Sequence, residues 1–432
     1  MVSAGFWLSF GAVAVILWGM TGRIAGTGLS GWQQLWWRWG RVQWLVAVGL
    51  LPVSISLFLE YPLLAPLANL LAVPWAGFVL VPLVLAAALL LLPFPAVGAA
   101  ALDASRWAAD ILWKFLEGLA ELDLIVRPGG AAPEAALVAA CVGALLMIAP
   151  RGFPGRVLGL VLLLPLLLNS GPRPAYGDYW LTLLDVGQGL AAVVRTHSHV
   201  LVYDAGPSYG SGFDAGRDVI APYLRNQGVG RVDRLVVSHE NSDHTGGVDA
   251  LRTAMTTLDI MTNADPWRAR ASACRAGTRW SWDGVGFAVL HPPSSADAHG
   301  NDGSCVLKIT GPGGRVLLTG DVEKQAEAVM LLRSRADLRA EVLVAPHHGS
   351  RSSSSRPFLD AVRPRVVFFP IGYRNRYHFP HMEVLRRLSD RGVRMFDTAR
   401  HGAIILKIDG EGGFHEPRLE RIASSRIWRA RD

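Results

Sequence analysis

The sequence predicts an α-helical membrane region followed by an α/β domain in which two sheets pack face to face with helices outside. Residues 1–170 are almost continuously apolar, whereas residues 178–432 have an ordinary globular composition. In the second part, short β-type runs come first and then alternate with helical stretches, which is the pattern of a layered sandwich. The prediction therefore divides the chain into a membrane region at 1–170, a globular domain at 178–415 and a basic tail at 416–432.

The composition agrees with this division. The 432 residues are 51% hydrophobic with a mean hydropathy of +0.28, more apolar than a typical soluble protein. The net charge is +7, and part of it sits in the arginine-rich tail. A basic excess beside a membrane suits anionic lipid or nucleic acid, and a solvated tail is the equally simple alternative.

Several segments of the first region approach the roughly 20 apolar residues that cross a bilayer. Spans are expected at 3–20, 42–59, 134–149 and 155–169. The intervening stretch at 61–95 is broken by Pro62, Pro66, Pro74 and Pro82. We expect a broken, re-entrant hairpin there, and the alternative is a single kinked span at 75–92. Residues 99–122 alternate apolar and charged side chains at helical spacing, which predicts a helix lying at the interface.

The positions of the charges predict the orientation, because short cytoplasmic loops are enriched in Lys and Arg. Two loops carry arginines and no acid, and both should face the cytoplasm; the arginines are Arg23, Arg38, Arg41, Arg151 and Arg156. The mainly acidic stretch 93–133 should face out. These assignments agree only if residues 61–92 enter and leave by the outer face, or cross twice. The globular domain then lies on the periplasmic side of a bacterial inner membrane.

This orientation bears on the three cysteines. Cys141 lies in an apolar span and is expected to be a buried thiol. Cys274 and Cys305 lie in the globular half, where an external, oxidising compartment permits them to pair. We therefore predict a Cys274–Cys305 disulfide.

The globular half contains a regular series of elements. Strands are expected at 180–186, 191–196, 199–206, 234–238, 285–291, 304–310, 315–321, 341–346, 365–372, 393–398 and 402–408. Helices are expected near 216–227, 246–254, 323–335, 355–362 and 381–391. In layered α/β folds, sites are built where strands end, so functional residues are expected directly after the strands.

Metal-ligand residue types follow three of these strands. They are His239, Asp243 and His244 after 234–238, Asp321 at the end of 315–321, and His347 and His348 after 341–346. Imidazole nitrogen and carboxylate oxygen suit zinc, manganese or iron. One such cluster is often a solvated loop, but three at successive strand ends predict a metal site.

The segments SHENSDHTGG, LLTGD and PHHGS together resemble the metallo-β-lactamase fold, an αββα sandwich. LLDVGQG, LVYDAG, PHHGSRSSSS and IGYRNRYHFPH are similar to the C-terminal domain of the ComEC family of competence DNA-uptake channels. SAGFWLSFGAV and LANLLAVPW resemble the second part of that family's channel domain. Family members usually begin with a soluble domain and further spans, so this chain is expected to be a truncated form.

The resemblance implies DNA internalisation across the inner membrane in natural transformation. One strand would pass through the membrane region, and an external metal-dependent nuclease domain would degrade the other strand. The implied cofactors are one or two divalent metal ions, manganese or zinc. The implied partners are single- and double-stranded DNA, the lipid bilayer, other competence proteins and, as a further option, a second copy of the chain.

The resemblance also assigns roles to residues. The metal ligands would be His239, Asn241, Asp243, His244, Asp321 and His347, with His348 as the alternative to His347 and Asp321 as the bridge. Asp243, His378 and His381 are the catalytic candidates. The two histidines would act as a late ligand or as proton donors. The alternative for them is a surface loop packed by Tyr377 and Phe379. Support from behind the ligands would come from Asp185, Gln188, Asp204, Gly206, Asn301 and Ser304.

Two departures leave alternatives open. Asn241 stands where the broader fold has histidine and the competence family often has aspartate, and an amide is a poorer ligand than either. The HGNDGS segment also lacks, in register, the histidine that normally precedes the TGD strand. A one-metal enzyme, a hydrolase of another ester and a DNA-binding domain with a degenerate metal site are therefore the rival interpretations.

Contacts with nucleic acid have weaker signals. The SRSSSSR run, Arg374, Arg376 and the arginine tail are candidates for phosphate contacts, although serines are also ordinary loop residues. Trp32, Trp36, Trp37 and Trp39 are candidates for base stacking, but beside a span they fit an interfacial belt better.

Overall fold

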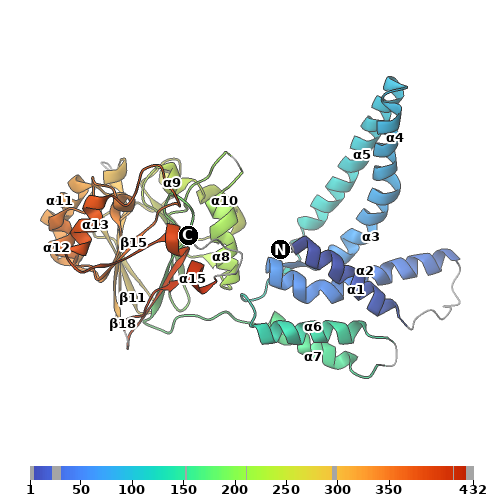
Figure 1. Ribbon diagram of the computed structural model, residues 1–432, viewed down its shortest axis with the longest axis horizontal. Helices are drawn as coiled ribbons and strands as arrows, with labels where there is room; N and C mark the ends of the chain where they lie inside the picture. Colours follow the sequence, from blue (N-terminus) through green and yellow to red (C-terminus); the bar gives the residue numbers. More distant parts are fainter. Residues whose placement is uncertain are drawn as a thin grey trace. The chain divides into compact units, whose positions relative to one another are not determined.

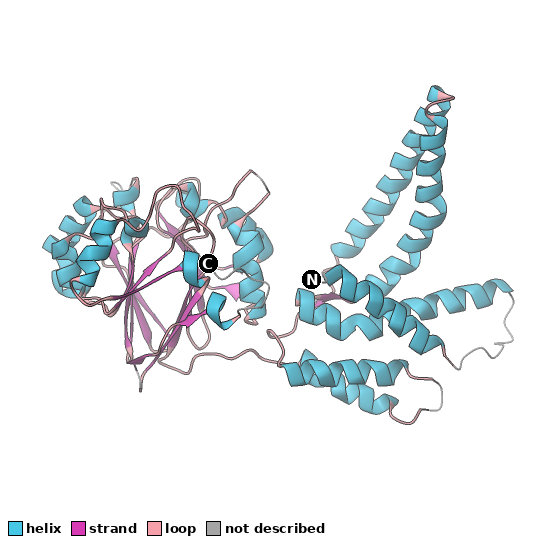
Figure 2. Ribbon diagram, viewed as in Figure 1, coloured by secondary structure: helices cyan, strands magenta, loops and turns pink. Residues whose placement is uncertain are grey.

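The structure is a computed structural model that describes residues 4–21, 31–150, 153–210, 212–293, 299–411 and 413–424. The chain divides into two compact units. The first comprises Met1–Gly171 with Asn226–Gly228, and the second comprises Pro172–Arg225 with Val229–Asp432. Figure 1 labels the elements along the chain, and Figure 2 shows that strands are concentrated in the second unit.

The first unit is helical. Its helices are α1 (Ala4–Met20), α2 (Gly31–Phe58), α3 (Ala65–Trp75), the π-helical turn η1 (Ala76–Leu80), α4 (Val81–Leu90), α5 (Pro95–Ala120), α6 (Glu134–Ile148) and α7 (Arg156–Leu167). Within the described residues, two stretches are long and apolar enough to cross a membrane, Trp39–Phe58 and Ala65–Leu90. The apolar helices α1, α6 and α7 are shorter.

Helix α2 begins before the predicted span. The sequence places Arg38 and Arg41 in a loop, but the structure places both within α2. The segment GWQQLWWRWG contains few helix breakers, so the helix extends through it without interruption. The Arg41 side chain donates a hydrogen bond to the carbonyl oxygen of Gly19 at 3.4 Å, which ties α2 to the end of α1. Arg23 and Arg151, which also contributed to the predicted orientation, lie outside the described residues.

The predicted break within residues 61–92 is wrong, because Ala65–Leu90 is one continuous helical run. Pro66 stands in the first turn of α3, where no backbone donor is needed, and Pro82 comes directly after the π-helical turn η1. Pro74 leaves the carbonyl of Leu70 without its helical donor, and the indole of Trp39 donates to that oxygen instead, at 3.2 Å. The π-helical turn η1 lies between Pro74 and Pro82, and a π-turn at such a position lets the helix continue past a proline.

The chain reverses at the end of α4, and α5 returns along it (Figure 1). The indole of Trp75 donates to the Ala108 carbonyl oxygen at 2.9 Å, which fixes α3 against α5. The short strands β1 (Tyr61–Pro62) and β2 (Ile125–Val126) pair antiparallel. Residues 63–124 therefore form a long hairpin that begins and ends at the paired strands β1 and β2. Helices α3 and α4 form its outgoing arm, and α5 forms its returning arm.

Helices α6 and α7 pack through small residues. A Cβ atom on Gly143 would lie 2.5 Å from the carbonyl oxygen of Gly159, and the reverse substitution would meet the same obstacle. Glycine at both positions thus lets the two backbones approach closely, as is common where apolar helices associate in membranes.

The second unit contains two large mixed sheets. The first has the order β18 (Gly413–Phe414), β17 (Ile404–Asp409), β3 (Tyr179–Leu183), β4 (Ala192–Arg195), β5 (Val200–Tyr203), β7 (Arg234–Val237) and β9 (Ile260–Thr262), and β19 (Arg418–Leu419) pairs with β17. The second has the order β10 (Arg279–Trp282), β11 (Val285–His291), β12 (Val306–Gly311), β13 (Gly314–Leu318), β14 (Val342–Val344), β15 (Val366–Phe369) and β16 (Arg394–Asp397). The short strands β6 (Arg231–Val232) and β8 (Thr256–Thr257) pair separately.

Three hydrophobic layers hold the second unit together. Side chains of both sheets, such as Leu183 and Phe368, form the central layer. One outer layer lies beneath α8 (Ala221–Asn226) and α10 (Val248–Ala254), and the other lies beneath α11 (Lys324–Ser334), α12 (Arg356–Val362) and α13 (Met382–Ser389). Figure 1 shows these two groups of helices on opposite sides of the sheets. The predicted αββα sandwich is confirmed.

The predicted tail contributes to this unit. Strand β19 and helix α15 (Glu420–Ala423) lie within the segment that was expected to be a free tail from residue 416. Arg421 of α15 donates to Asp185 at 2.8 Å. Arg426, Arg429 and Arg431 lie outside the described residues.

Part of the serine run has a structural role. Ser353 and Ser354 are buried. The Glu327 carboxylate of α11, itself fully buried, accepts the backbone N–H groups of Ser354 and Ser355. The guanidinium of Arg387 donates to the carbonyl oxygens of Ser353 and Ser354 from the other side. The loop after His347 and His348 is thus clamped by two charged side chains.

We expect the Glu327→Ala variant to lower the free energy of unfolding by roughly 2–4 kcal/mol, because it leaves two buried N–H donors without an acceptor. Glu327→Gln, which keeps one acceptor, should cost less. Urea denaturation of the purified chain measures the difference. Gln325→Ala, an exposed position on the same helix, is the control and should be neutral. Equal stabilities of Glu327→Ala and Gln325→Ala would contradict this account of the clamp.

Candidate metal centre

Four side chains from three strand ends meet in one cluster. Asp243 and His244 come from the short helix α9 (Ser242–Thr245) after β7, Asp321 follows β13, and His348 lies in the turn η6 (Pro346–Gly349) after β14. One ligand atom from each of the four lies within 4.8 Å of all the others. Because β13 and β14 run parallel, as do β5 and β7, these ends gather at one edge of the sandwich.

The distances show two imidazoles aimed at two carboxylates. His244 Nε2 lies 3.1 Å from Asp321 Oδ1 and 3.9 Å from Asp243 Oδ2. His348 Nε2 lies 3.3 Å from Asp243 Oδ2 and 3.5 Å from Asp321 Oδ1. Both Nε2 atoms are buried, and neither makes a well-directed hydrogen bond. Buried polar atoms without such bonds are costly, and a cation between them would satisfy all four groups. Two nitrogen and two oxygen donors suit zinc, manganese or iron.

Asp204 orients His244 from behind. This fully buried carboxylate lies 2.7 Å from His244 Nδ1 and accepts from both the backbone N–H and the hydroxyl of Ser238, at 2.6 and 2.8 Å. Nδ1–H donation to Asp204 leaves Nε2 of His244 free for a metal. His348 is oriented in the same way, because its Nδ1 lies 2.7 Å from the carbonyl oxygen of Pro370. The supporting role predicted for Asp204 thus has a direct contact.

The carboxylates and imidazoles of the cluster shift each other's pKa values. Burial raises the pKa of Asp321, but the neighbouring imidazoles of His244 and His348 outweigh it, and the net pKa lies well below the usual value. Burial lowers the pKa of His244, but Asp321 and Asp204 more than offset it and raise the net pKa well above its usual value. The carboxylates therefore remain anionic and attract positive charge, which the imidazoles supply as protons or a metal ion supplies in their place.

His239 stands beside this cluster and carries no charge. Its ring centroid lies 4.3 Å from that of His244, and Nδ1 lies 3.0 Å from the Ser238 hydroxyl. Burial, with a contribution from His244, lowers the pKa of His239 to about 3. Its buried Nε2 makes no hydrogen bond. A neutral imidazole with a free nitrogen is a good ligand, so His239 fits a second metal position next to the four-residue cluster.

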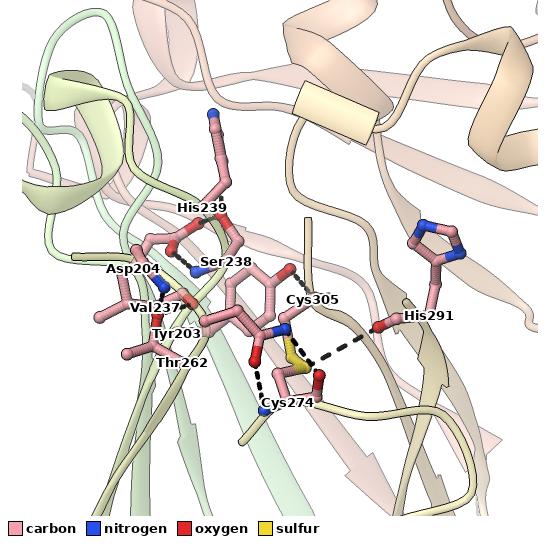
Figure 3. Close-up of a disulfide and its surroundings, with 11 residues drawn as sticks. Tyr203, Asp204, Val237, Ser238, His239, Thr262, Cys274, His291 and Cys305 are labelled. Carbon is pink, nitrogen blue, oxygen red and sulfur yellow. Dashed lines mark hydrogen bonds between the residues drawn. A yellow bond between two sulfur atoms is a disulfide. The ribbon is translucent and has the colours of Figure 1, made fainter. Parts of the chain in front are cut away.

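Figure 3 shows His239, Ser238 and Asp204 near the disulfide that joins Cys274 to Cys305. The N–H of Cys305 donates to the Ser238 carbonyl oxygen at 2.9 Å, and the Tyr203 hydroxyl donates to the Cys305 carbonyl oxygen. The pair predicted from the orientation is therefore present, and it braces the backbone that carries His239.

The structure separates the two adjacent histidines. His348 joins the cluster, whereas His347 lies at its edge, with Nε2 3.8 Å from Asp321 Oδ2. His347 Nδ1 lies 3.0 Å from Glu323 Oε1. Left-handed backbone at both histidines, with φ of 48° and 54°, turns the two rings in different directions. Glu323 was not predicted, and no sequence pattern distinguishes it from other acids at the start of a helix.

Asn241 does not enter the cluster. Its exposed amide donates to Asn301 Oδ1 at 2.8 Å, and Asn301 Nδ2 donates in turn to Glu323 at 3.3 Å. The predicted ligand role of Asn241 is therefore not supported, and Asn301 belongs to a chain of contacts that ends at His347. Ser304 supports the cluster as expected, because its hydroxyl accepts the backbone N–H of Asp321 at 3.1 Å.

The loop that contains Asp185 and Gln188 supports the site through its backbone. Leu190 N–H donates to the Asp243 carbonyl oxygen at 3.1 Å. A Cβ on Gly189 would lie 2.3 Å from that oxygen, so the position requires glycine. The Asp185 side chain itself pairs with Arg421, which corrects its predicted role behind the ligands. Gln188 accepts the N–H of Gly372 at 3.2 Å and so links two loops near the site.

His378 and His381 remain outside the cluster. His378 is exposed, and His381 precedes α13, with its backbone N–H bound to the Gly349 carbonyl oxygen. Phe379 lies against the histidines of the site instead, with its ring centroid 5.8 Å from that of His347 and 6.3 Å from that of His348. The aromatic packing that was the alternative for this loop is what the structure contains.

Comparison with known proteins identifies both regions. Residues 1–153 match the family described as competence protein, and residues 184–372 match the metallo-beta-lactamase superfamily. Over 97% of its length the chain is 34% identical to the competence protein ComA of Neisseria gonorrhoeae, of which it covers 58%. It is 28% identical to recombination protein 2 of Haemophilus influenzae, covering 97% of this chain and 56% of that protein.

The chain thus spans about half the length of the curated relatives it matches. Among solved structures, a metallo hydrolase of the archaeon Ignicoccus hospitalis aligns with 53% of this chain and all of its own, at 15% identity and a TM-score of 0.39.

The separation of the two histidines gives a direct test. We expect His348→Ala to lose bound divalent metal, because it removes one of the four donors, whereas His347→Ala should retain most of it. Inductively coupled plasma mass spectrometry of the purified variants, after loading with manganese or zinc and desalting, measures the content. The reverse order, with metal lost only from His347→Ala, would show that the wrong histidine has been assigned.

Proposed function

Because the chain belongs to the ComEC family of competence proteins, we propose that it acts in DNA internalisation across the bacterial inner membrane during natural transformation. In this proposal the second unit is an external, metal-dependent phosphodiesterase that degrades the strand that is not transported. The metallo-β-lactamase fold implies divalent metal binding. The cluster of Asp243, His244, Asp321 and His348 is the observation that carries the hydrolytic part of the proposal.

The residues divide the chemistry between them. A divalent cation held by the four donors would polarise a phosphoryl oxygen and offset the charge that develops there. Asp204 and the Pro370 carbonyl keep the Nε2 atoms of His244 and His348 aimed inward. His347 lies with Nδ1 beside Glu323 and Nε2 at the edge of the cluster, so that as an imidazolium it could give the Nε2 proton to a departing oxygen and keep the Nδ1 proton toward Glu323. This assigns to His347 the proton transfer that was expected of His378 or His381.

A metal-dependent nuclease assay tests this proposal. The full chain in detergent with Mn²⁺ should cleave DNA, and Asp321→Ala should lower the rate at least a hundredfold because it removes a buried carboxylate that lies within 3.5 Å of both imidazoles. Asp390→Ala, an exposed carboxylate at the end of α13, is the matched control and should cleave normally. Hydrolysis of simple esters without any cleavage of DNA would favour the rival assignment as another hydrolase, and a metal-loaded chain that cleaves neither would overturn both.

We further propose a multi-pass topology in the inner membrane with the second unit on the periplasmic side. The hairpin of residues 63–124 supports it. Because β1 and β2 pair with each other, both ends of the hairpin would lie on the same side of the membrane. If α3–α4 cross in one direction, α5 crosses back, and the arginines of α2 and α7 then face the cytoplasm as the charge rule requires. Helix α5 is in this case a crossing helix, whose charged side chains must face protein or water rather than lipid.

Cysteine labelling in intact cells tests this topology. In a Cys141→Ala background, we expect Leu124→Cys to react with an impermeant maleimide from outside, because it lies beside β2 at the base of the hairpin. Leu92→Cys, at the tip and 90% exposed, should react only after the cells are permeabilised. Labelling of Leu92→Cys in intact cells would show that the hairpin does not cross the bilayer.

A further inference from the structure

A column of stacked rings leads out of the metal centre. The loop of residues 370–381 joins β15 to α13 and carries the sequence PIGYRNRYHFPH. The ring of Phe379 stacks on His348, with centroids 6.3 Å apart and planes 19° apart. Tyr377 stacks on Phe379 in turn, with ring centroids 5.5 Å apart and planes 18° apart. The outermost ring, Tyr377, is 44% exposed, so the column ends at a solvent-exposed ring.

Two arginines accompany the tyrosines of this loop. The guanidinium of Arg376 lies 4.9 Å from the centre of the Tyr377 ring and donates to its hydroxyl at 2.7 Å. Arg374 lies 5.1 Å from the centre of the Tyr373 ring, and Tyr373 is 57% exposed. Neither arginine forms an ion pair with a carboxylate among the described residues. The loop therefore presents two guanidinium groups beside two solvent-exposed tyrosine rings.

A third exposed tyrosine lies on a different loop. Tyr209 is 48% exposed and stacks on Phe213 at 5.8 Å. A Cβ atom on Gly187 would lie 3.9 Å from the Tyr209 hydroxyl oxygen, so Tyr209 lies beside the loop whose Leu190 N–H donates to the Asp243 carbonyl oxygen. The same loop contacts the loop of residues 370–381, because Gln188 accepts the N–H of Gly372 at 3.2 Å.

None of the three tyrosines belongs to a hydrophobic core of the second unit. Surfaces that bind single-stranded nucleic acid commonly combine exposed aromatic rings with arginines. Bases stack on the rings, and phosphates contact the guanidinium groups.

We propose that Tyr209, Tyr373, Tyr377, Arg374 and Arg376 form an aromatic rim that binds a single strand of nucleic acid and leads it to the metal centre. A base can stack on a protein ring only when the face of the base is free. In a duplex the bases are already stacked on each other, so their faces are covered. The rim therefore selects single strands over duplexes. This inference rests on the proposed function and names the form of the substrate that the same site receives.

Binding without cleavage tests the rim separately from the hydrolytic activity. The full chain in detergent, with EDTA present, is titrated into a fluorescent oligothymidylate and into an oligomer of the same length whose residues are abasic. Fluorescence anisotropy gives the dissociation constants. We expect the wild type to bind oligothymidylate at least tenfold more tightly than the abasic oligomer, and to bind a duplex of the same length more weakly than the single strand.

Substitutions then assign the preference to the rim. The double variant Tyr373→Ala with Tyr377→Ala should lose about tenfold in affinity for oligothymidylate and bind the abasic oligomer as the wild type does. Tyr373→Phe with Tyr377→Phe should restore most of the loss, because phenylalanine keeps the stacking face. Arg374→Gln should weaken both oligomers alike and reduce the salt dependence of binding by about one phosphate contact.

Three outcomes would overturn the rim. They are equal affinity of the wild type for both oligomers, an equal loss of affinity for both in the alanine double variant, and tighter binding of the duplex than of the single strand. A misfolded variant is recognised by its melting temperature, and in that case the wild-type comparison of the oligomers decides alone. A chain that binds single strands in this way but never cleaves them would contradict the proposed nuclease and leave the rim intact.

Discussion

The buried carboxylate of Asp204 is the constraint on which the metal centre depends. It has no solvent exposure and is held at the end of β5 in a left-handed conformation, with φ of 58°. It accepts from Ser238 at the end of β7 and faces Nδ1 of His244 in the next loop. A carboxylate buried without these partners would be severely destabilising. The same contacts that satisfy Asp204 therefore determine where His244 points, and the site is assembled as the two strands pair.

The other ligands are positioned by comparable means. Ser304 holds the backbone of Asp321, the Pro370 carbonyl holds His348, and the close approach of Gly189 seats the loop of Asp243. Each contact uses a backbone group or a short side chain, which varies little in position once the sheets have formed. Rigid sites bordered by exposed loops are a common arrangement in enzymes.

Strand-end residues were the part of the site that the sequence predicted well. Asp243, His244 and Asp321 follow strands whose apolar runs are easy to recognise, so their convergence follows from the layered fold. His347 and His348 were not separable, because only the backbone angles of the turn decide which ring faces inward. Glu323 and the contact of Leu190 with Asp243 left no signal, since one is an ordinary acid and the other a backbone group. In the first unit, the prolines at 66, 74 and 82 suggested a broken segment. The helix continues because the Trp39 indole replaces the N–H donor that Pro74 lacks, and because a π-turn precedes Pro82.

Anomalous diffraction from crystals of the manganese-loaded chain, collected at the manganese edge, tests the central claim most directly. The account predicts an anomalous peak within coordinating distance, about 2.0–2.3 Å, of Asp243, His244, Asp321 and His348. A second, weaker peak beside His239 would be compatible with it. A peak coordinated by His347 with His348 turned away, or ordered electron density for the four side chains with no peak between them, would contradict it.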